Sequence, residues 1–183
     1  MPREPTWSAI RTIDPRRMRK VDLKKLLHRV ETVPIGSPEL DSEFESAFRS
    51  VPSRVTRSID AAARLIETEL PGWWWNCGHC ALRNGASLYV PGSSQIQVDF
   101  PNAKIPADFE PRPEHLQLLQ DPKWGKVFNR GFHCNRGGGT IPLAMLSVFL
   151  QAKIALTLVQ AETSANKVTP LTPPLRALHG PRY

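Results

Sequence analysis

The sequence predicts an α+β protein in which helices pack on both sides of a three- to four-stranded antiparallel sheet. The run Trp73-Trp74-Trp75 puts large apolar rings on both faces of a strand, so both faces need a cover. Helical patterns precede and follow this run, at 58–70 and 140–161. The Asn84-Gly85 dipeptide between two apolar segments favours a tight hairpin turn. Together these features predict a sheet between helices.

The chain divides into a folded part and two extensions. Residues 1–20 form a basic arm, and 21–165 form a single α-β-α domain. Within the domain, 101–130 is a proline-rich insertion that we expect to pack loosely. Residues 166–183 read as an irregular tail without a core of its own, because they are mainly proline, leucine, threonine and a few basic residues.

Four helices are expected to begin after residues whose hydroxyl or carboxylate can cap them. These residues are Asp22, Ser37, Ser58 and Thr140. Pro38 at the first position of the second helix supports that start. The last helix is apolar around most of its circumference, so it should be the most buried one.

The strands follow the third helix. The tryptophan strand comes first, 86–90 is the second strand, and 95–100 alternates apolar and polar residues as a third strand would. A short helix is expected at 115–120, and 127–133 is a candidate fourth strand. An antiparallel meander is the simplest arrangement of these elements.

Positive charge is concentrated near the N-terminus. The chain has a net charge of +7, and residues 1–30 hold nine basic side chains against three acidic ones. Such a segment attracts phosphate-rich or acidic partners, although a solvated arm without a partner has the same composition. The candidate binding residues are Arg16, Arg17, Arg19, Lys20, Arg83, Arg136, Gly138 and Gly139.

Gly138 and Gly139 belong to a turn that leads into the final helix. Free amides at a helix start, next to Arg136, can hold an anion or a phosphate. The turn lacks the lysine of a P-loop, and glycines before a helix are also common as plain connections.

The three cysteines allow two kinds of chemistry. The segment Cys77-Gly78-His79-Cys80 has the lettering of a dithiol oxidoreductase, but no helix follows to lower a thiol pKa. With His133 and Cys134, the two cysteines provide four zinc ligands if the strand bends at Gly78. Small buried cysteines without a metal are the alternative, so we expect no metal or cofactor.

The cysteine count and the apolar segments also indicate where in the cell the protein is expected. An odd number of cysteines and no secretory leader favour a reducing compartment, and we expect a cytoplasmic protein. The apolar run 141–159 is interrupted by Gln151 and Lys153, so no membrane span is expected.

Five sequence blocks occur along the chain in this order: Asp22-Leu23-Lys24-Lys25-Leu26-Leu27-His28-Arg29-Val30-Glu31, Glu39-Leu40-Asp41, Thr56-Arg57-Ser58-Ile59-Asp60-Ala61-Ala62, Leu70-Pro71-Gly72-Trp73-Trp74-Trp75 and Gly139-Thr140-Ile141-Pro142-Leu143-Ala144-Met145-Leu146. Together they resemble the phage ABA sandwich family, small phage and prophage proteins named for an alpha-beta-alpha layering. The resemblance covers about 22–100 and 131–160. It implies a helix–sheet–helix fold and a phage or prophage origin, and it brings no catalytic residue.

Three functions remain open at this point. The first is a non-enzymatic phage accessory protein that binds a host protein or ribonucleoprotein, such as a CRISPR effector or a nuclease, and inhibits it. The second is a nucleic-acid or cyclic-nucleotide binder that uses the basic arm, Arg83, Arg136 and the glycine turn. The third is a zinc or dithiol protein. No acid pair and no nucleophile beside a base is visible in the sequence, which favours binding over catalysis.

Overall fold

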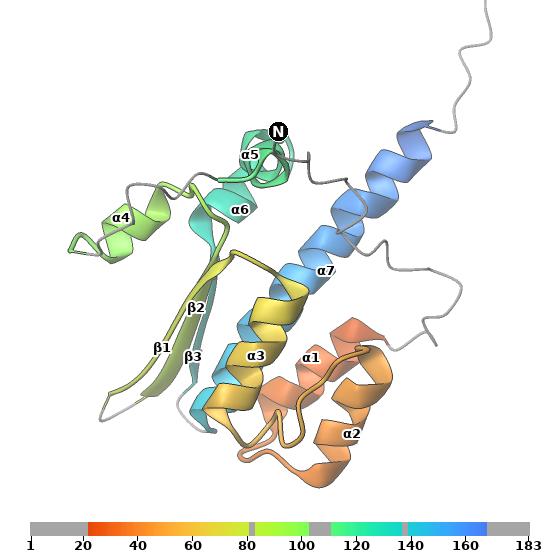
Figure 1. Ribbon diagram of the computed structural model, residues 1–183, viewed down its shortest axis with the longest axis vertical. Coiled ribbons are helices and arrows are strands. Elements are labelled where there is room, and N and C mark those ends of the chain that lie inside the picture. Colours follow the sequence, from red (N-terminus) through yellow and green to blue (C-terminus); the bar gives the residue numbers. More distant parts are fainter. Residues whose placement is uncertain (1–21, 81–82, 103–110, 137–138, 168–183) are drawn as a thin grey trace, which may run out of the picture.

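The structure, a computed structural model, describes residues 22–80, 83–102, 111–136 and 139–167. Within them the fold is α+β, with helices flanking a three-stranded antiparallel sheet, as predicted (Figure 1). The elements are α1 (Leu23–Thr32), α2 (Pro38–Ala47), α3 (Ile59–Glu69), β1 (Trp74–Cys80), β2 (Arg83–Tyr89), α4 (Gln95–Asp99), α5 (Pro113–Gln120), α6 (Gly125–Arg130), β3 (Phe132–Arg136) and α7 (Ile141–Lys167).

The first three helices begin where the capping residues predict. Asp22 accepts a hydrogen bond from the Lys24 amide, and Ser37 and Ser58 accept bonds from amides three residues later. The prediction that Thr140 caps the last helix is wrong. The hydroxyl of Thr140 is buried without a hydrogen-bond partner, so it does not satisfy an amide of the first turn of α7.

The sheet has the order β1-β2-β3, and one of its faces packs on α7. Side chains that alternate along the strands point to this side and are buried, among them Ala86, Leu88, Phe132 and Cys134. Helix α7 also packs on α1 and α3, so it lies at the centre of the helical layer.

Helix α7 is the most buried helix, as predicted, and its residues from Leu143 to Leu150 are almost free of solvent contact. By length and composition alone, Ile141–Ala165 would also suffice to cross a membrane. Because 67% of its apolar window is buried inside the protein, the same stretch fits a core helix.

The three tryptophans lie on two sides of the strand, as the sequence predicts. Trp73, just before β1, packs in the helical layer with its ring 6.3 Å from Phe128 and 6.2 Å from Phe132. Trp75 also packs against the core. Trp74 lies on the other face, where its ring is 4.8 Å from that of Phe100.

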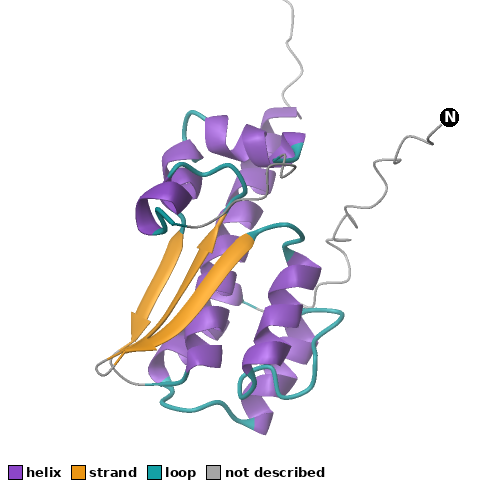
Figure 2. Ribbon diagram, turned by 60° about the vertical axis from the view of Figure 1, so that its left-hand side comes forward, coloured by secondary structure: helices purple, strands orange, loops and turns teal. Residues whose placement is uncertain are grey.

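The two faces of the sheet are covered very unequally. On the side away from α7, α4 and Phe100 pack over one end of the sheet, against Trp74 and Tyr89. In Figure 2, α7 lies behind the strands, and the helices on the viewer's side of the sheet are at its upper end. The rest of this face carries no helix from the described residues.

The hairpin exists, but its turn is not at Asn84-Gly85. Both residues lie inside β2, where they pair with His79 and Gly78. Cys80 pairs with Arg83, so the connection is 81–82, outside the described residues. Longer strand pairing overrides the local turn preference of the dipeptide.

The predicted third strand at 95–100 is the helix α4. Ile96 is buried, whereas Val98 is 69% exposed, although the two would share a face in a strand. The Ser93 hydroxyl accepts a bond from the Gln95 amide, and Gln95 bonds to Asp99 one helical turn later. An alternation over so few residues does not separate a strand from a short helix.

The third strand comes from farther along the chain. The candidate strand at 127–133 is mostly helix α6, and β3 starts only at Phe132. Gly131, with φ of +74°, separates the two elements. Phe128 of α6 is fully buried, so this helix is anchored in the core and this part of the insertion is not loosely packed.

Helix α5 contains a buried histidine. His115 is 5% exposed, and its Nδ1 has no hydrogen-bond partner. Burial lowers the pKa of His115 from 6.5, while Glu114 opposes this shift and Arg112 adds to it. The folded protein therefore holds this imidazole neutral at pH values where the unfolded chain protonates it.

Lowering the pH from about 7 to about 5 is therefore expected to destabilise the protein through His115. The contribution is complete above the unfolded pKa and is lost as the pH falls below it. His115→Leu should flatten the pH dependence of the unfolding free energy by at most about 1.4 kcal/mol per pH unit. Chemical denaturation at several pH values measures this slope, and an unchanged slope in the variant would refute the assignment.

Candidate functional site

The candidate site is the face of the sheet turned away from α7, which we call the open face. Strand pairing arranges it in three rows across β1, β2 and the β3 segment. The rows are Trp74, Tyr89 and Gly131; Asn76, Ser87 and His133; and Gly78, Gly85 and Asn135. The first row is aromatic, the second is polar, and the third is mostly bare backbone.

The aromatic row is the covered end of the open face. Tyr89 is buried and donates a hydrogen bond of 2.6 Å to Asp99 of α4. Burial, together with this bond to Asp99, raises the pKa of Tyr89 to about 12. A Cβ on Gly131 would lie 2.6 Å from the Tyr89 ring, so this position needs glycine for space as well as for its positive φ.

The polar row has a defined hydrogen-bond direction. The Nε2 of His133 lies 2.9 Å from the carbonyl oxygen of Arg130, which can only accept, so Nε2 carries a proton. In the neutral ring Nδ1 then accepts from the Ser87 hydroxyl at 3.2 Å. His133 is exposed and Ser87 is half-buried, so the row presents oriented polar groups to solvent.

Ser87 and His133 are a nucleophile beside a base, which the sequence analysis did not find. Acyl transfer also needs donors for an oxyanion, most often backbone amides. Ser87 lies in the middle strand, which is paired on both sides, so the amides around it are already engaged. We interpret the pair as part of a hydrogen-bonding surface.

The glycine row is the most accessible part of the open face. Gly78 and Asn135 are exposed, and Gly85 is half-buried. A Cβ on Gly85 would lie 3.1 Å from Oδ1 of Asn135, whereas a Cβ on Gly78 would meet no atom within 4 Å. The glycine row therefore exposes a flat stretch of backbone beside the polar row.

The structure places the predicted binding residues as follows. Arg16, Arg17, Arg19, Lys20 and Gly138 lie outside the described residues. Arg83 begins β2 and Arg136 ends β3, where it pairs with Asn84.

Gly139 lies at the same end of the sheet, because its carbonyl accepts a 2.5 Å hydrogen bond from Nδ2 of Asn84. Asn84 in turn bonds to His79. The backbones of Arg83, Arg136 and Gly139 thus lie at one end of the sheet, and their use in binding stays a prediction.

The zinc grouping is not formed by the described side chains. His133 lies on the open face, whereas Cys134 is buried on the helix side, because neighbouring residues of a strand point to opposite faces. The described residues contain no group of three or more potential ligands.

The dithiol chemistry is not supported either. Cys77 is followed by further strand, not by a helix. Burial raises the pKa of the Cys77 thiol, which is opposite to the shift that a redox thiol needs.

Asn76, Ser87 and Asn135 had no signal in the sequence as site residues. Ser87 and His133 are 46 positions apart, and only the register of β2 and β3 joins them. The short alternation around Ser87 indicates a strand, but it does not tell which face stays uncovered.

The fold and the site define a class of protein: an α+β protein with helices packed mainly on one face of a three-stranded sheet and an open, polar opposite face. No known protein family, curated protein or solved structure matches the chain.

Proposed function

We propose that this is a non-enzymatic phage or prophage accessory protein that acts by binding, and that its open face holds the partner. The observation that carries this proposal is that the polar row and the glycine row are accessible to solvent next to the aromatic row. These two rows hold the side chains of Asn76, Ser87, His133 and Asn135 beside two glycines. A paired sheet holds these groups in fixed positions, so little ordering is needed when a partner binds.

The proposed partner is a host defence complex, a nuclease or a ribonucleoprotein, in the cytoplasm of an infected or lysogenic bacterium. The resemblance to the phage ABA sandwich family supports the origin. The net charge of +7 favours contact with a nucleic-acid backbone or with an acidic protein face. Binding at such a surface would block access to it.

Affinity purification from a bacterial host tests this function. The tagged protein is expected to retain a partner in stoichiometric amount, and His133→Ala/Asn135→Ala is expected to lose it, because both side chains are exposed on the open face. Glu45→Ala/Arg49→Ala, exposed on and beside α2, is the control that should retain it. Equal recovery with the open-face variant would show that the partner is held elsewhere.

A further inference from the structure

Strand β1 forms one edge of the sheet, and within the described residues it pairs with β2 alone. About half of the backbone amides and carbonyls of such a strand point away from its neighbour, so a further strand can bond to them. Residues 74–77 are half-buried, and Gly78 and His79 are exposed. The described part of the chain therefore leaves this edge accessible.

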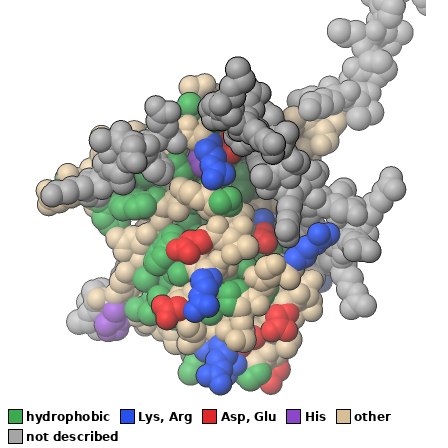
Figure 3. All heavy atoms as spheres, in the orientation of Figure 1, with side chains coloured by type: hydrophobic (Ala, Val, Ile, Leu, Met, Phe, Trp, Pro, Cys, Tyr) green, Lys and Arg blue, Asp and Glu red, His purple; other side chains and the backbone are tan. Residues whose placement is uncertain are grey.

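The edge of β1 also lacks the features that usually prevent strands from pairing at an edge. The strand contains no Lys, Arg, Asp, Glu or proline, and its pairing with β2 runs from Trp74 to Cys80 without a bulge. In Figure 3, apolar side chains lie along the left part of the face, where β1 runs, and charged side chains lie over the helices to its right. Nothing in β1 itself therefore opposes the addition of another strand.

The helical layer extends beyond the sheet at this edge. On the side that faces the helices, Leu88 and Phe132 are buried, whereas Trp75, in the same row across the sheet, is only half-buried. Helix α7 packs mainly on β2 and β3, and α3 packs on α7 with few contacts to β1. In Figure 2, α3, the helix that leads into the right-hand strand, lies beyond the outer edge of that strand. A fourth strand would lie next to α3 and would bury Trp75 and Cys77 further.

The two sides of β1 define the side chains that an added strand needs. Toward the helices β1 presents Trp75 and Cys77, so alternate residues of the added strand should be apolar. Toward the open face it presents Asn76 and Gly78, so the residues in between should be small or polar. Because β1 carries no charged residue, backbone hydrogen bonds and apolar packing would hold the segment.

Resting on the proposed binding function, we infer that the partner contributes an extended protein segment that pairs with β1 as a fourth strand. The segment has apolar residues at alternate positions, and it continues the rows of the open face by one residue each. A second copy of this chain fits this edge less well. Symmetric pairing of two β1 strands would bring both α3 helices to the same edge.

A displayed library of peptides of about nine residues, selected on the full chain, tests this inference. Enriched peptides are expected to alternate apolar and polar residues and to slow hydrogen exchange of β1 amides, because strand pairing protects them. They should also protect the thiol of Cys77 from alkylation, with the buried Cys134 as the unreactive reference. Their affinity should change by less than about twofold between roughly 50 and 200 mM salt, because no ion pair is involved.

Cys77→Lys is the decisive variant. It places a charge where an apolar side chain of the added strand would pack, so peptide affinity should fall at least about tenfold. Ala47→Lys is the matched control, because it adds the same charge at another half-buried position, at the end of α2, and should bind like the wild type. Melting temperatures show whether both variants are folded. If Cys77→Lys does not fold, Gly78→Lys replaces it and should also weaken binding, since a side chain there meets no atom within 4 Å.

The inference is overturned if no peptide is enriched, if enriched peptides leave the β1 amides unprotected, or if a folded edge variant binds them as tightly as the wild type. Light scattering of the free protein should show a monomer. A dimer that Cys77→Lys dissociates would mean that β1 pairs with a second copy, which would also overturn the inference.

The experiment separates the two proposals. If a host partner is retained by the wild type and by Cys77→Lys but lost with His133→Ala/Asn135→Ala, the binding function stands and the strand inference fails. If peptides protect β1 but no host partner is retained, the edge accepts a strand and the proposed function fails. If neither is observed, both fail.

Discussion

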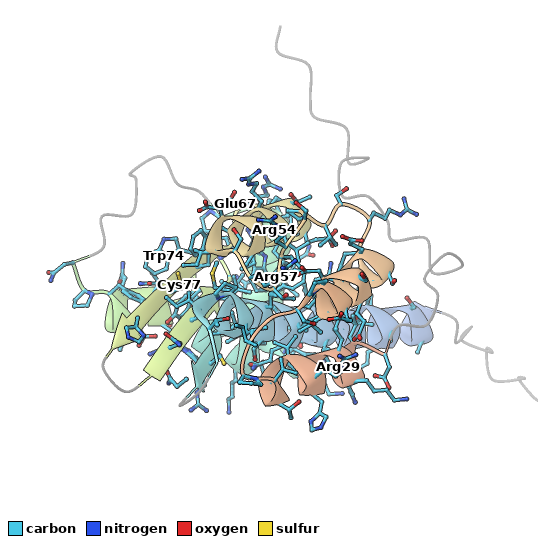
Figure 4. All side chains as sticks on the ribbon, turned by 90° about the horizontal axis from the view of Figure 1, so that it is seen from below. Arg29, Arg54, Arg57, Glu67, Trp74 and Cys77 are labelled. Atoms are coloured by element: carbon cyan, nitrogen blue, oxygen red, sulfur yellow. The ribbon has the colours of Figure 1, made fainter. Side chains whose placement is uncertain are left out.

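Asp41→Ala is expected to lower the free energy of unfolding by about 3 kcal/mol, because it leaves two buried donors of Thr56 without an acceptor. Asp41 is 5% exposed, and its carboxylate accepts hydrogen bonds from the amide and hydroxyl of Thr56 and two from the guanidinium of Arg57. Thr56 is fully buried, so its donors would lose their acceptor away from water. Figure 4 shows Arg57 between α2 and α3, the two helices that this network joins.

Chemical denaturation measures the loss, and Glu39→Ala is the matched control. It removes the same charge from the same helix, but Glu39 is exposed, so its effect should be much smaller. Burial raises the pKa of Asp41, but the bonds from Thr56 and Arg57 outweigh it and hold the pKa below 3.8. This part of the stability is therefore present above pH 3.8 and is lost as the pH falls below it. Equal losses in the two variants would contradict the role given to Asp41.

Gly36→Ala is expected to destabilise the protein by about 3 kcal/mol, at the upper end of the usual cost of overpacking. Gly36 is buried, and a Cβ there would lie 2.2 Å from the carbonyl oxygen and 2.5 Å from Oγ1 of Thr56. The obstacle includes backbone, so the chain between α1 and α2 would have to move. That movement would also disturb the hydrogen bonds of Asp41.

Gly78→Ala is the control for this second variant, because the same methyl group meets nothing within 4 Å. Its stability should equal or exceed that of the wild type. Thermal and denaturant unfolding of the two alanine variants compares them directly. A similar loss of unfolding free energy at both positions would show that the close approach of Thr56 is not what makes Gly36→Ala destabilising.

Asp41, Thr56 and Arg57, the residues of the first prediction, belong to two of the sequence blocks described above, whereas Gly36 belongs to none of them. The blocks 39–41 and 56–62 meet through Asp41, Thr56 and Arg57. The two blocks therefore have a structural role, because their contacts hold α2 against the start of α3. They do not contribute to the open face.

Helix positions were predictable where a local signal and a periodic pattern agree. The caps at Asp22, Ser37 and Ser58 act within three residues of the chain, and each is present in the structure. The tryptophan strand was predictable because rings on both sides of a segment require cover on both sides. Local signals failed at 84–85 and 95–100, where pairing with β1 and contacts with Tyr89 decide the conformation.

The candidate site was predictable only in part. The sequence points to Arg83, Arg136 and Gly139, whose backbones lie at one end of the sheet, outside the three rows of the open face. It does not show that Asn76, Ser87 and His133 form a row, because that row depends on the register of three strands. A shift of one residue in either pairing would move these side chains to the other face.

By itself, the sequence determined the α+β class, the starts of α1 to α3, the buried character of α7 and the uneven distribution of charge. All of these follow from interactions between near neighbours in the chain or from composition. Only the tertiary structure decided which strand completes the sheet, which face stays open and which residues meet on it. Those outcomes depend on contacts between distant segments, and the free energy of such contacts is set by packing that no local pattern encodes.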